Sequence, residues 1–282
     1  MNHHPPIGEV EGKKEQVEAM FDAIAPRYDL LNRILSLGID RGWRRQAVAL
    51  LQDARPRRIL DVATGTADLA IEAARRLEAE KVVGVDIAEQ MLEVGREKIA
   101  RMDLADRVTL QRGDAEKLPF SDAQFDAALV AFGVRNFQDL DRGLEEIRRV
   151  LRPGGTLVVL EFSQPRAFPI KQLYGLYSRH VLPRVGGALS KDDGAYRYLP
   201  ASVAAFPAGD DFLARLRLAG YGALLWRPLT FGSASLSRGR AGAGAGNTSP
   251  AWRGSGPGRW LPGGAARRSR TGPRARRPPS GG

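Results

Sequence analysis

The sequence predicts an α/β fold with a mostly parallel sheet, helices on both faces, an N-terminal helical cap and a disordered C-terminal tail. Three observations lead to this expectation. Short and almost continuously apolar segments recur through the middle of the chain, helical patterns separate them, and acidic residues follow several of them. Buried parallel strands show such apolar runs because helices cover both of their faces.

The helical cap is expected over residues 13–51, after a mobile leader over residues 1–12. An amphipathic pattern begins at Lys13 and ends at Pro26, and a second helical stretch ends before Gly38. A third stretch runs from about Trp43 to Leu51. Because all three precede the first strand, they are expected to flank the sheet.

The core is expected over residues 56–162, and the substrate-side helices and closing strands over 163–236. Alternation of apolar runs and helical patterns predicts strands at 58–62, 81–86, 108–110, 125–130 and 156–161. Helices are expected through Leu77 and over 91–101, 141–151, 169–181 and 211–219. Segments 221–226 and 230–236 are expected to close the sheet as an antiparallel pair.

The segment 237–282 differs from the rest of the chain in composition. It contains ten of the 43 basic residues, all arginine, and no acidic residue or Val, Ile, Phe or Tyr. The net charge of +11 therefore belongs mostly to this tail, and the preceding part is nearly neutral. Such a segment cannot bury enough apolar surface to offset its conformational entropy, so disorder is expected. Its codons would be GC-rich, which favours a shifted reading frame near Leu236; the rival interpretation is an arginine-rich arm for nucleic acid or anionic lipid.

Composition also limits the compartment and the chemistry. No segment approaches the ~20 apolar residues of a membrane span, and no secretory signal precedes the first helix. The chain has no cysteine, which excludes disulfides, thiolate metal sites and cysteine nucleophiles. A cytoplasmic protein without a metal site is the expectation.

The turn after the first expected strand is the first candidate for ligand binding. Asp61 ends the apolar run, and Gly65 stands among small residues that allow a ligand to approach the backbone. Dinucleotide-binding proteins have three glycines here, where a pyrophosphate lies on the helix N-terminus. One glycine with neighbouring acids suits S-adenosylmethionine, which carries no phosphate and has cationic groups. A purely structural turn would look the same.

Two further acids follow the next strands. Asp86 ends the second strand, where a carboxylate can accept both ribose hydroxyls, although an N-cap for the next helix is the structural alternative. Asp114 follows the third strand and could accept the adenine amino group; alone, it would be read as a solvated turn residue. Because three successive strand ends carry acids, the sequence predicts a nucleoside ligand.

Several motifs between about Lys13 and Leu236 resemble the C-methyltransferases of quinone biosynthesis. These enzymes act on demethylmenaquinone and on the methoxy-polyprenyl-benzoquinol precursor of ubiquinone. The motifs are Tyr28-Asp29-Leu30-Leu31-Asn32, Ser36-Leu37-Gly38-Ile39-Asp40 with Trp43, Phe132-Gly133-Val134-Arg135-Asn136, Arg149-Val150-Leu151-Arg152-Pro153-Gly154-Gly155, Tyr177-Ser178-Arg179-His180-Val181-Leu182-Pro183 and Tyr196-Arg197-Tyr198-Leu199.

The resemblance implies a Rossmann-like class I methyltransferase fold with S-adenosyl-L-methionine as cofactor. It implies cofactor binding at Thr66, Asp86, Asp114 and Ala115, with Asp61 and Gly65 shaping the turn. The implied substrate is a prenylated quinol, more closely a naphthoquinol such as demethylmenaquinol than a benzoquinol. Such a substrate implies peripheral contact with the inner face of the membrane, and a homodimer is compatible with the family. No nucleic-acid partner is expected.

Methyl transfer to a quinol ring carbon requires an aligned ring, loss of a hydroxyl proton and exclusion of water. Candidate residues for these tasks are Arg135, which could stabilise a phenolate, Asn136, which could bind a quinol oxygen, and His180, as base or as a structural residue. Tyr28 and Tyr177 are candidates for the substrate side, and each could equally be core packing. The pair Asp192-Asp193 and Tyr196 are read as a solvated loop rather than the mouth of the pocket.

Other functions compete with this interpretation. A methyltransferase for another small molecule has the same cofactor motifs. An NAD-dependent oxidoreductase would need the second and third glycines of the first turn. A basic nucleic-acid-binding protein is supported by the tail alone, and a base-methylating enzyme would have an Asn/Asp-Pro-Pro-aromatic run where this chain has Ala131-Phe132-Gly133-Val134.

Overall fold

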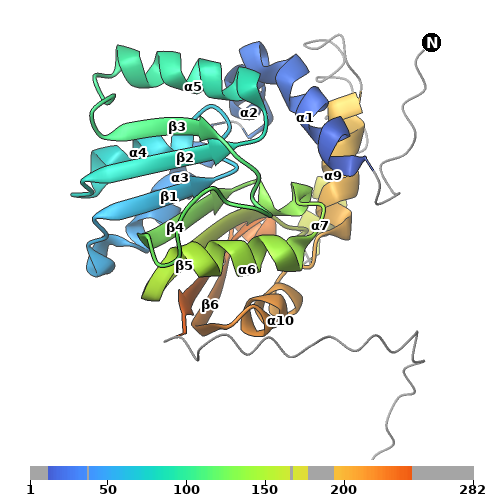
Figure 1. Cartoon of the computed structure of the whole chain (residues 1–282). Helices are drawn as coiled ribbons and strands as arrows, with labels where there is room; N and C mark the ends of the chain where they lie inside the picture. The colour runs from blue at the N-terminus through green and yellow to red at the C-terminus, as the bar shows by residue number, and fades with distance from the viewer. Residues whose placement is uncertain (1–11, 37, 166–167, 177–193, 243–282) are drawn as a thin grey trace, which may run out of the picture. The chain divides into compact units, whose positions relative to one another are not determined.

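A seven-stranded sheet forms the centre of the computed structural model, which describes residues 12–36, 38–165, 168–176 and 194–242 (Figure 1). The strand order is β3-β2-β1-β4-β5-β7-β6. Strands β1 to β5 are parallel, and β7 pairs antiparallel with both β5 and β6. The strands are β1 Arg58–Val62, β2 Lys81–Asp86, β3 Val108–Arg112, β4 Phe125–Ala131, β5 Leu151–Phe162, β6 Tyr221–Leu229 and β7 Ala234–Ala241.

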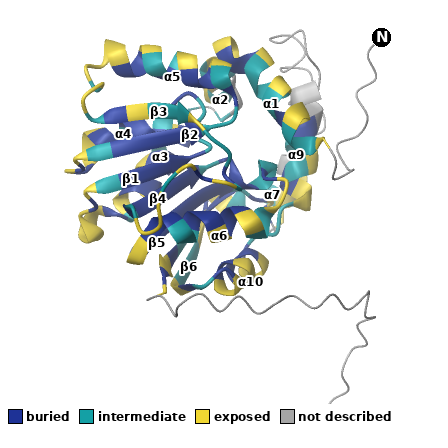
Figure 2. Cartoon of the chain, in the orientation of Figure 1, coloured by how far each residue is buried: buried dark blue, intermediate teal, exposed yellow. Residues whose placement is uncertain are grey.

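Helices cover both faces of the sheet, as the apolar strands predict. Alternate residues of β1 face opposite layers: Ile59 packs with α3 and α4, whereas Leu60 packs with α6 and α10. The burial pattern in Figure 2 follows these layers, with buried strands and exposed outer helix faces. The α-helices are α1 Lys13–Ile24, α2 Tyr28–Leu35, α3 Asp40–Ala49, α4 Asp68–Arg76, α5 Glu89–Arg101, α6 Leu140–Val150, α7 Ile170–Leu176, α9 Gly194–Ala205 and α10 Asp210–Leu218.

The expected fold class, helical cap and five parallel strands are confirmed. Two of the elements, and the last strand described below, differ from the expectation. Helix α9 has no counterpart in the sequence interpretation, which assigned Tyr196 to a loop. Strand β5 begins at Leu151 rather than Thr156, because Leu151 already pairs with Phe125 across an irregularity in the register.

The last strand was placed wrongly at both ends. Residues 230–232 form a turn, because Thr230, Phe231 and Gly232 all have positive φ. Strand β7 then continues past Leu236 to Ala241 and pairs with β5 as far as Arg240. Its buried positions beyond Leu236 are Ser237, Gly239 and Ala241, which give no apolar signal in the sequence. Residues 243–282, the greater part of the expected tail, lie outside the described residues, as do residues 1–11 of the leader.

Candidate functional site

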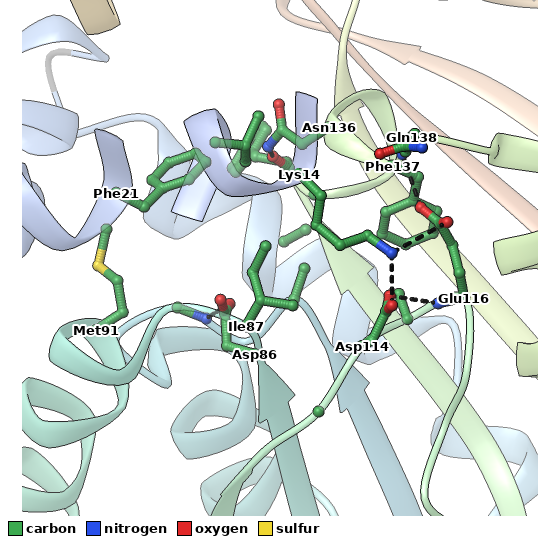
Figure 3. Close-up of a pocket in the computed structure, with 18 of the residues that line it drawn as sticks. Lys14, Phe21, Asp86, Ile87, Met91, Asp114, Glu116, Asn136, Phe137 and Gln138 are labelled. Atoms are coloured by element: carbon green, nitrogen blue, oxygen red, sulfur yellow. Dashed lines mark hydrogen bonds and ion pairs between the residues drawn. The ribbon is translucent and has the colours of Figure 1, made fainter. Parts of the chain in front are cut away.

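A cavity lies beyond the carboxyl ends of the parallel strands, which is where open α/β sheets bind ligands; its empty space, counted together with the open solvent at its mouth, is about 680 Å³. Helix α1 lies beside it and contributes Lys14, Val17 and Phe21 to its wall (Figure 3). The other lining residues are Tyr28, Ala63, Gly65, Asp86, Ile87, Met91, Gly113, Asp114, Ala115, Glu116, Ala131, Phe132, Gly133, Asn136, Phe137 and Gln138.

The turn after β1 and the turn after β4 meet at the cavity with strained backbones. Ala63 and Phe132 both have positive φ, at 52° and 59°, as does Gly65 at 54°. Such strain persists only where the surrounding structure imposes it, and it concentrates at functional sites. Gly133 permits the close approach of the two turns, because a Cβ there would lie 2.5 Å from the Cβ of Ala63.

Asp86 lines the cavity at the end of β2, as expected. Its two carboxylate oxygens accept hydrogen bonds from the backbone amides of Gly65, at 2.7 Å, and Ala88, at 3.0 Å. Burial raises the pKa of Asp86, and the two amides oppose this effect. Helix α5 begins after Ala88, which is its N-cap, so the alternative role of Asp86 as that N-cap is wrong. Asp86 instead joins the first turn to the second strand end.

Asp114 also lines the cavity, next to Ala115. It forms an ion pair with Lys14, which the sequence analysis did not identify as a site residue. The ammonium of Lys14 on α1 lies 2.5 Å from Asp114 Oδ2 and 3.3 Å from Glu116 Oε2 (Figure 3). Burial lowers the pKa of Lys14, but the two carboxylates outweigh burial and raise it overall. Lys14 therefore stays charged and occupies one side of the expected adenine acceptor.

Asp61 and Thr66 lie behind the cavity wall rather than in it. Asp61 is almost fully buried, and the hydroxyl of Thr64 donates to its Oδ2 at 2.6 Å. Its Oδ1 is buried with no hydrogen-bond partner among the described residues. Burial raises the pKa of Asp61 to about 7. The hydroxyl of Thr66 donates to Asp29 at 2.6 Å, so this side chain points away from the ligand space.

A buried charge network behind Thr66 was not predicted. Lys98 on α5 bonds Asp29 on α2 at 2.7 Å, and it also pairs with Asp68 on α4. Arg44 on α3 lies 3.2 Å from Asp68. Burial raises the pKa of Asp68, but Arg44 and Lys98 outweigh burial, so the pKa is lowered overall. The network ties helices α2 to α5 together beneath the first turn and joins the cap to the core.

On the acceptor side, Asn136 lines the cavity but Arg135 does not. The Arg135 guanidinium is buried and lies 2.9 Å from Oε1 of Glu161, which is also buried. It also donates to the carbonyl of Phe132 and to Ser202 Oγ, the latter at 3.3 Å. Asn136 is bonded to Tyr198 on α9, with the tyrosine hydroxyl 3.0 Å from Oδ1. Neither Glu161 nor Tyr198 was singled out from the sequence for a role in the site.

Tyr28 lines the cavity, packs edge-on against Phe21 and lies opposite Gly65. Burial raises the pKa of Tyr28. Tyr177 and His180, the other candidates on the substrate side, lie outside the described residues, as does the pair Asp192-Asp193. Of Tyr196 only the backbone, in α9, is described.

The residues present fit a nucleoside with a cationic tail. Asp86 and Asp114 offer carboxylates on neighbouring strand ends, and Ile87, Met91 and Phe137 add apolar side chains to the lining. The buried Asp61, whose pKa is raised to about 7, adds an unused acceptor close to the first turn. Acidic strand ends without a phosphate-binding glycine loop favour a cationic ligand over a pyrophosphate.

Similarity to known proteins decides the family. The model of the ubiE/COQ5 methyltransferase family matches residues 9–240. This chain belongs to the ubiE/COQ5 methyltransferase family. As a member, it is an S-adenosylmethionine-dependent methyltransferase. Because the family match extends to residue 240, it includes nearly all of β7.

Individual relatives of the ubiE/COQ5 family match almost over their whole length. The demethylmenaquinone methyltransferase of Bacteroides fragilis is 51% identical over 227 residues, which cover 80% of this chain and 93% of the relative. That of Deinococcus radiodurans is 49% identical over 234 residues, or 83% and 96% of the two chains. The ubiquinone/menaquinone biosynthesis C-methyltransferase of Geotalea daltonii is 47% identical over 228 residues, or 80% and 97%.

Solved structures share the class I methyltransferase fold of this ubiE/COQ5 family member. The [4+2]-cyclase SpnF superposes with a TM-score of 0.60 at 20% identity, covering 82% of this chain and 97% of the cyclase. An S-adenosylmethionine-dependent methyltransferase of Thermotoga maritima gives 0.55 at 21% identity, covering 79% and 98%. The fold alone does not determine the reaction, as the cyclase illustrates. Among the described residues, no helix is long and apolar enough to cross a membrane.

Proposed function

We propose that this enzyme methylates a ring carbon of demethylmenaquinol, a prenylated naphthoquinol, to give menaquinol. The observation that carries the proposal is the near-complete alignment, at about half identity, with two proteins named demethylmenaquinone methyltransferase. A cavity lined by carboxylate, aromatic and amide side chains supports it. The bound cofactor supplies an electrophilic methyl group on a positively charged sulfur.

The residues of the cavity suit the three requirements of the reaction. Asp86 and Asp114 hold the nucleoside end, so that the reacting part lies towards Ala63, Gly65 and Phe132. The aromatic rings of Phe21, Tyr28 and Phe132 keep water from the acceptor ring, which favours a reaction that destroys charge. Asn136 is the polar side chain on this side that can reach a ring oxygen.

Arg135 is assigned a structural role rather than the expected role in stabilising a phenolate. Because Glu161 neutralises its charge at 2.9 Å and both side chains are buried, we assign it to holding the turn after β4 in place rather than to stabilising a phenolate. This role keeps the strained Phe132 and the neighbouring Asn136 in position. Removing either partner would leave an uncompensated buried charge.

A benzoquinol acceptor is the second candidate, since relatives at 46–47% identity are named ubiquinone/menaquinone biosynthesis C-methyltransferases. Purified enzyme with radiolabelled S-adenosylmethionine should label reduced demethylmenaquinone in detergent micelles, and label the methoxy-polyprenyl-benzoquinol more slowly. Labelling of the benzoquinol alone would select the second candidate. Absence of label in both quinols would reject quinol methylation.

A further inference from the structure

Helix α9 holds two adjacent residues of the turn after β4 through two of its side chains. Tyr198 and Ser202 are four residues apart and therefore lie on the same face of the helix. The Tyr198 hydroxyl lies 3.0 Å from Oδ1 of Asn136, and Ser202 Oγ lies 3.3 Å from Nε of Arg135. Helix α9 thus connects the Tyr196-Arg197-Tyr198-Leu199 motif to the Phe132-Gly133-Val134-Arg135-Asn136 motif.

These contacts define which way the Asn136 amide faces. The amide nitrogen lies 3.4 Å from the carbonyl oxygen of Phe132, which can only accept a hydrogen bond. The amide oxygen must then face Tyr198, and the tyrosine must be the donor because this oxygen can only accept. One N–H of the amide is used by Phe132. The second remains for the cavity, which Asn136 lines.

We propose that Tyr198 is a positioning residue that fixes the Asn136 amide as a hydrogen-bond donor to a ring oxygen of the methyl acceptor. The inference rests on the proposed function, in which a quinol hydroxyl loses its proton to solvent, so that negative charge develops on its oxygen. A ring carbon then attacks the cofactor methyl group; the new C–C bond forms as the methyl–sulfur bond breaks, S-adenosylhomocysteine leaves, and the proton of that carbon shifts to the oxygen to restore the aromatic ring. An N–H aimed at that oxygen stabilises the developing charge. The opposite orientation of the amide would place a carbonyl lone pair against the same oxygen and oppose the reaction.

The surroundings of Tyr198 suit this task. Its side chain is 7% exposed, so the ring has little freedom to leave Asn136. Burial raises the pKa of its hydroxyl, and the nearby Arg135 opposes this effect. The hydroxyl therefore stays protonated over the working pH range and remains a donor.

Tyr198→Phe tests the proposal, because it removes the hydroxyl and keeps the ring. We expect kcat for the quinol to fall about tenfold, with the Kd for S-adenosylmethionine and the melting temperature nearly unchanged. Tyr221→Phe is the matched control, since the buried Tyr221 hydroxyl also bonds a single acceptor, the Leu144 carbonyl, far from the cavity. That variant should keep wild-type kcat. Wild-type kcat in folded Tyr198→Phe would overturn the proposal.

A double-mutant cycle shows whether Tyr198 acts through Asn136. Asn136→Ala should lower kcat by about a hundredfold or more, as for other preorganised donors. Adding Tyr198→Phe to Asn136→Ala should then cause no further loss, because there is no amide left to orient. A further tenfold loss in the double variant would show an independent role of Tyr198 and overturn the proposal.

Two further readouts keep the proposal testable if Tyr198→Phe folds poorly. Asn136→Asp still accepts from Tyr198 but offers no donor, so its kcat should fall below that of Asn136→Ala; wild-type kcat would overturn the proposal. The acid limb of the kcat–pH profile should move to higher pH in Tyr198→Phe, because the quinol hydroxyl then loses its proton less easily, and an unmoved limb would contradict the role.

Failure of the proposed function itself would appear separately, as a wild-type enzyme that does not turn over quinols. In that case, the Asn136 side-chain amide is observed by NMR in wild type and Tyr198→Phe. A changed amide resonance in the variant would support the orientation by Tyr198. Identical resonances would reject it.

Discussion

The carboxylates of Asp61, Asp86 and Asp114 follow three strands in the same way but have different electrostatic surroundings. Asp61 is buried with one oxygen unpaired, and Asp86 is held by two backbone amides. Asp114 is neutralised by the ammonium of Lys14. Each acid can therefore be tested by a different property of cofactor binding.

Asp86→Ala is expected to weaken S-adenosylmethionine binding at least tenfold. The proposed role of Asp86 is a charge-assisted pair with the ribose hydroxyls, and its loss is expected to cost about 1.4 kcal/mol or more. Isothermal titration calorimetry measures the effect. Asp86→Asn is the control for the turn, because its amide oxygen can still accept from Gly65 or Ala88; unchanged affinity in both variants would contradict the assignment.

Asp61 is expected to make cofactor affinity depend on pH. Its folded-state pKa of about 7 lies above the usual value of 3.8, so the ionised form is disfavoured when the site is empty; this destabilisation grows as pH rises between these two values and is constant above about 7. A cationic cofactor favours the carboxylate. The Kd for S-adenosylmethionine should therefore fall as pH rises from 5.5 to 7.5, by at most about tenfold per pH unit, and level off above.

Asp61→Asn identifies the source of this pH dependence. The variant should bind the cofactor more weakly at pH 7.5 and show a flatter dependence on pH than the wild type. It should also melt at a higher temperature than the wild type at pH 8 without cofactor, since no charge is then buried. An equally steep pH dependence in the variant would assign the effect to another group.

At the scale of single residues, the sequence predicted which residues lie at the cavity better than it predicted which residues they contact. Asp86 and Asp114 could be placed in the cavity because strand ends of a parallel sheet meet at one edge. Lys14 could not be placed there from the sequence, because the pattern of an amphipathic helix does not indicate which strand end a given side chain will contact. The pairing of Arg135 with Glu161 joins two separate strand ends and has no sequence signal either.

Among the elements, helix α1 has the closest relation to the cofactor space. Polar contacts bind it along its length: Lys13 donates to the Phe137 carbonyl at 2.7 Å, Glu18 pairs with Arg112 at 2.5 Å, and Asp22 accepts from the Gln90 amide at 2.9 Å. Between them, Lys14 bonds Asp114. Polar contacts therefore hold the helix along its length beside the part of the cavity that Asp114 lines.

Lys14→Met is expected to strengthen cofactor binding by about two- to fivefold. Asp114 is the proposed acceptor of the adenine amino group, with which the Lys14 ammonium would compete, and a partly exposed ion pair of this kind contributes only about 0–1 kcal/mol to stability. Calorimetry with S-adenosylmethionine measures the gain. Lys13→Met is the neighbouring control, since Lys13 bonds a backbone carbonyl rather than the acceptor of adenine; weaker binding in Lys14→Met would show that Lys14 closes over the cofactor instead.

The elements also show where sequence patterns fail. Strands β1, β2 and β4 were predicted well because two covering layers require apolar residues at every position. Strand β7 pairs on both edges, yet its buried half beyond Leu236 consists of Ser237, Gly239 and Ala241. Small residues are enough to fill these buried positions, so composition alone placed the end of the strand at Leu236 instead of Ala241.

At the scale of the whole molecule, the reading-frame hypothesis changes in one respect. Because β7 and the family match both continue to about residue 240, a frame change belongs after Ala241 rather than near Leu236. Resequencing the gene is expected to show a one- or two-base correction downstream of that codon. A confirmed frame would contradict this expectation.

Removal of residues 243–282 is expected to leave cofactor affinity and turnover in detergent within about twofold of the full chain. The cavity and its supporting contacts are built from residues before Gly242. Comparison of the full chain and the truncated chain in both assays checks the expectation. Loss of turnover in the truncated chain would show that the arginine-rich arm is required for activity. Loss of binding to lipid vesicles, measured in a separate assay, would show that the arm is required for membrane association.

Strand β7 has a consequence for how the protein is made. It lies between β5 and β6, both of which precede it in the chain, so the sheet has a gap until the last described strand has been synthesised. Until β7 has been synthesised, β5 and β6 have unpaired backbone hydrogen-bonding groups on the edges that β7 will occupy. Such edges can pair with other chains. Completion of the sheet is thus postponed until residues 234–241 have been synthesised, and any interruption of synthesis before Ala241 would leave this gap unfilled.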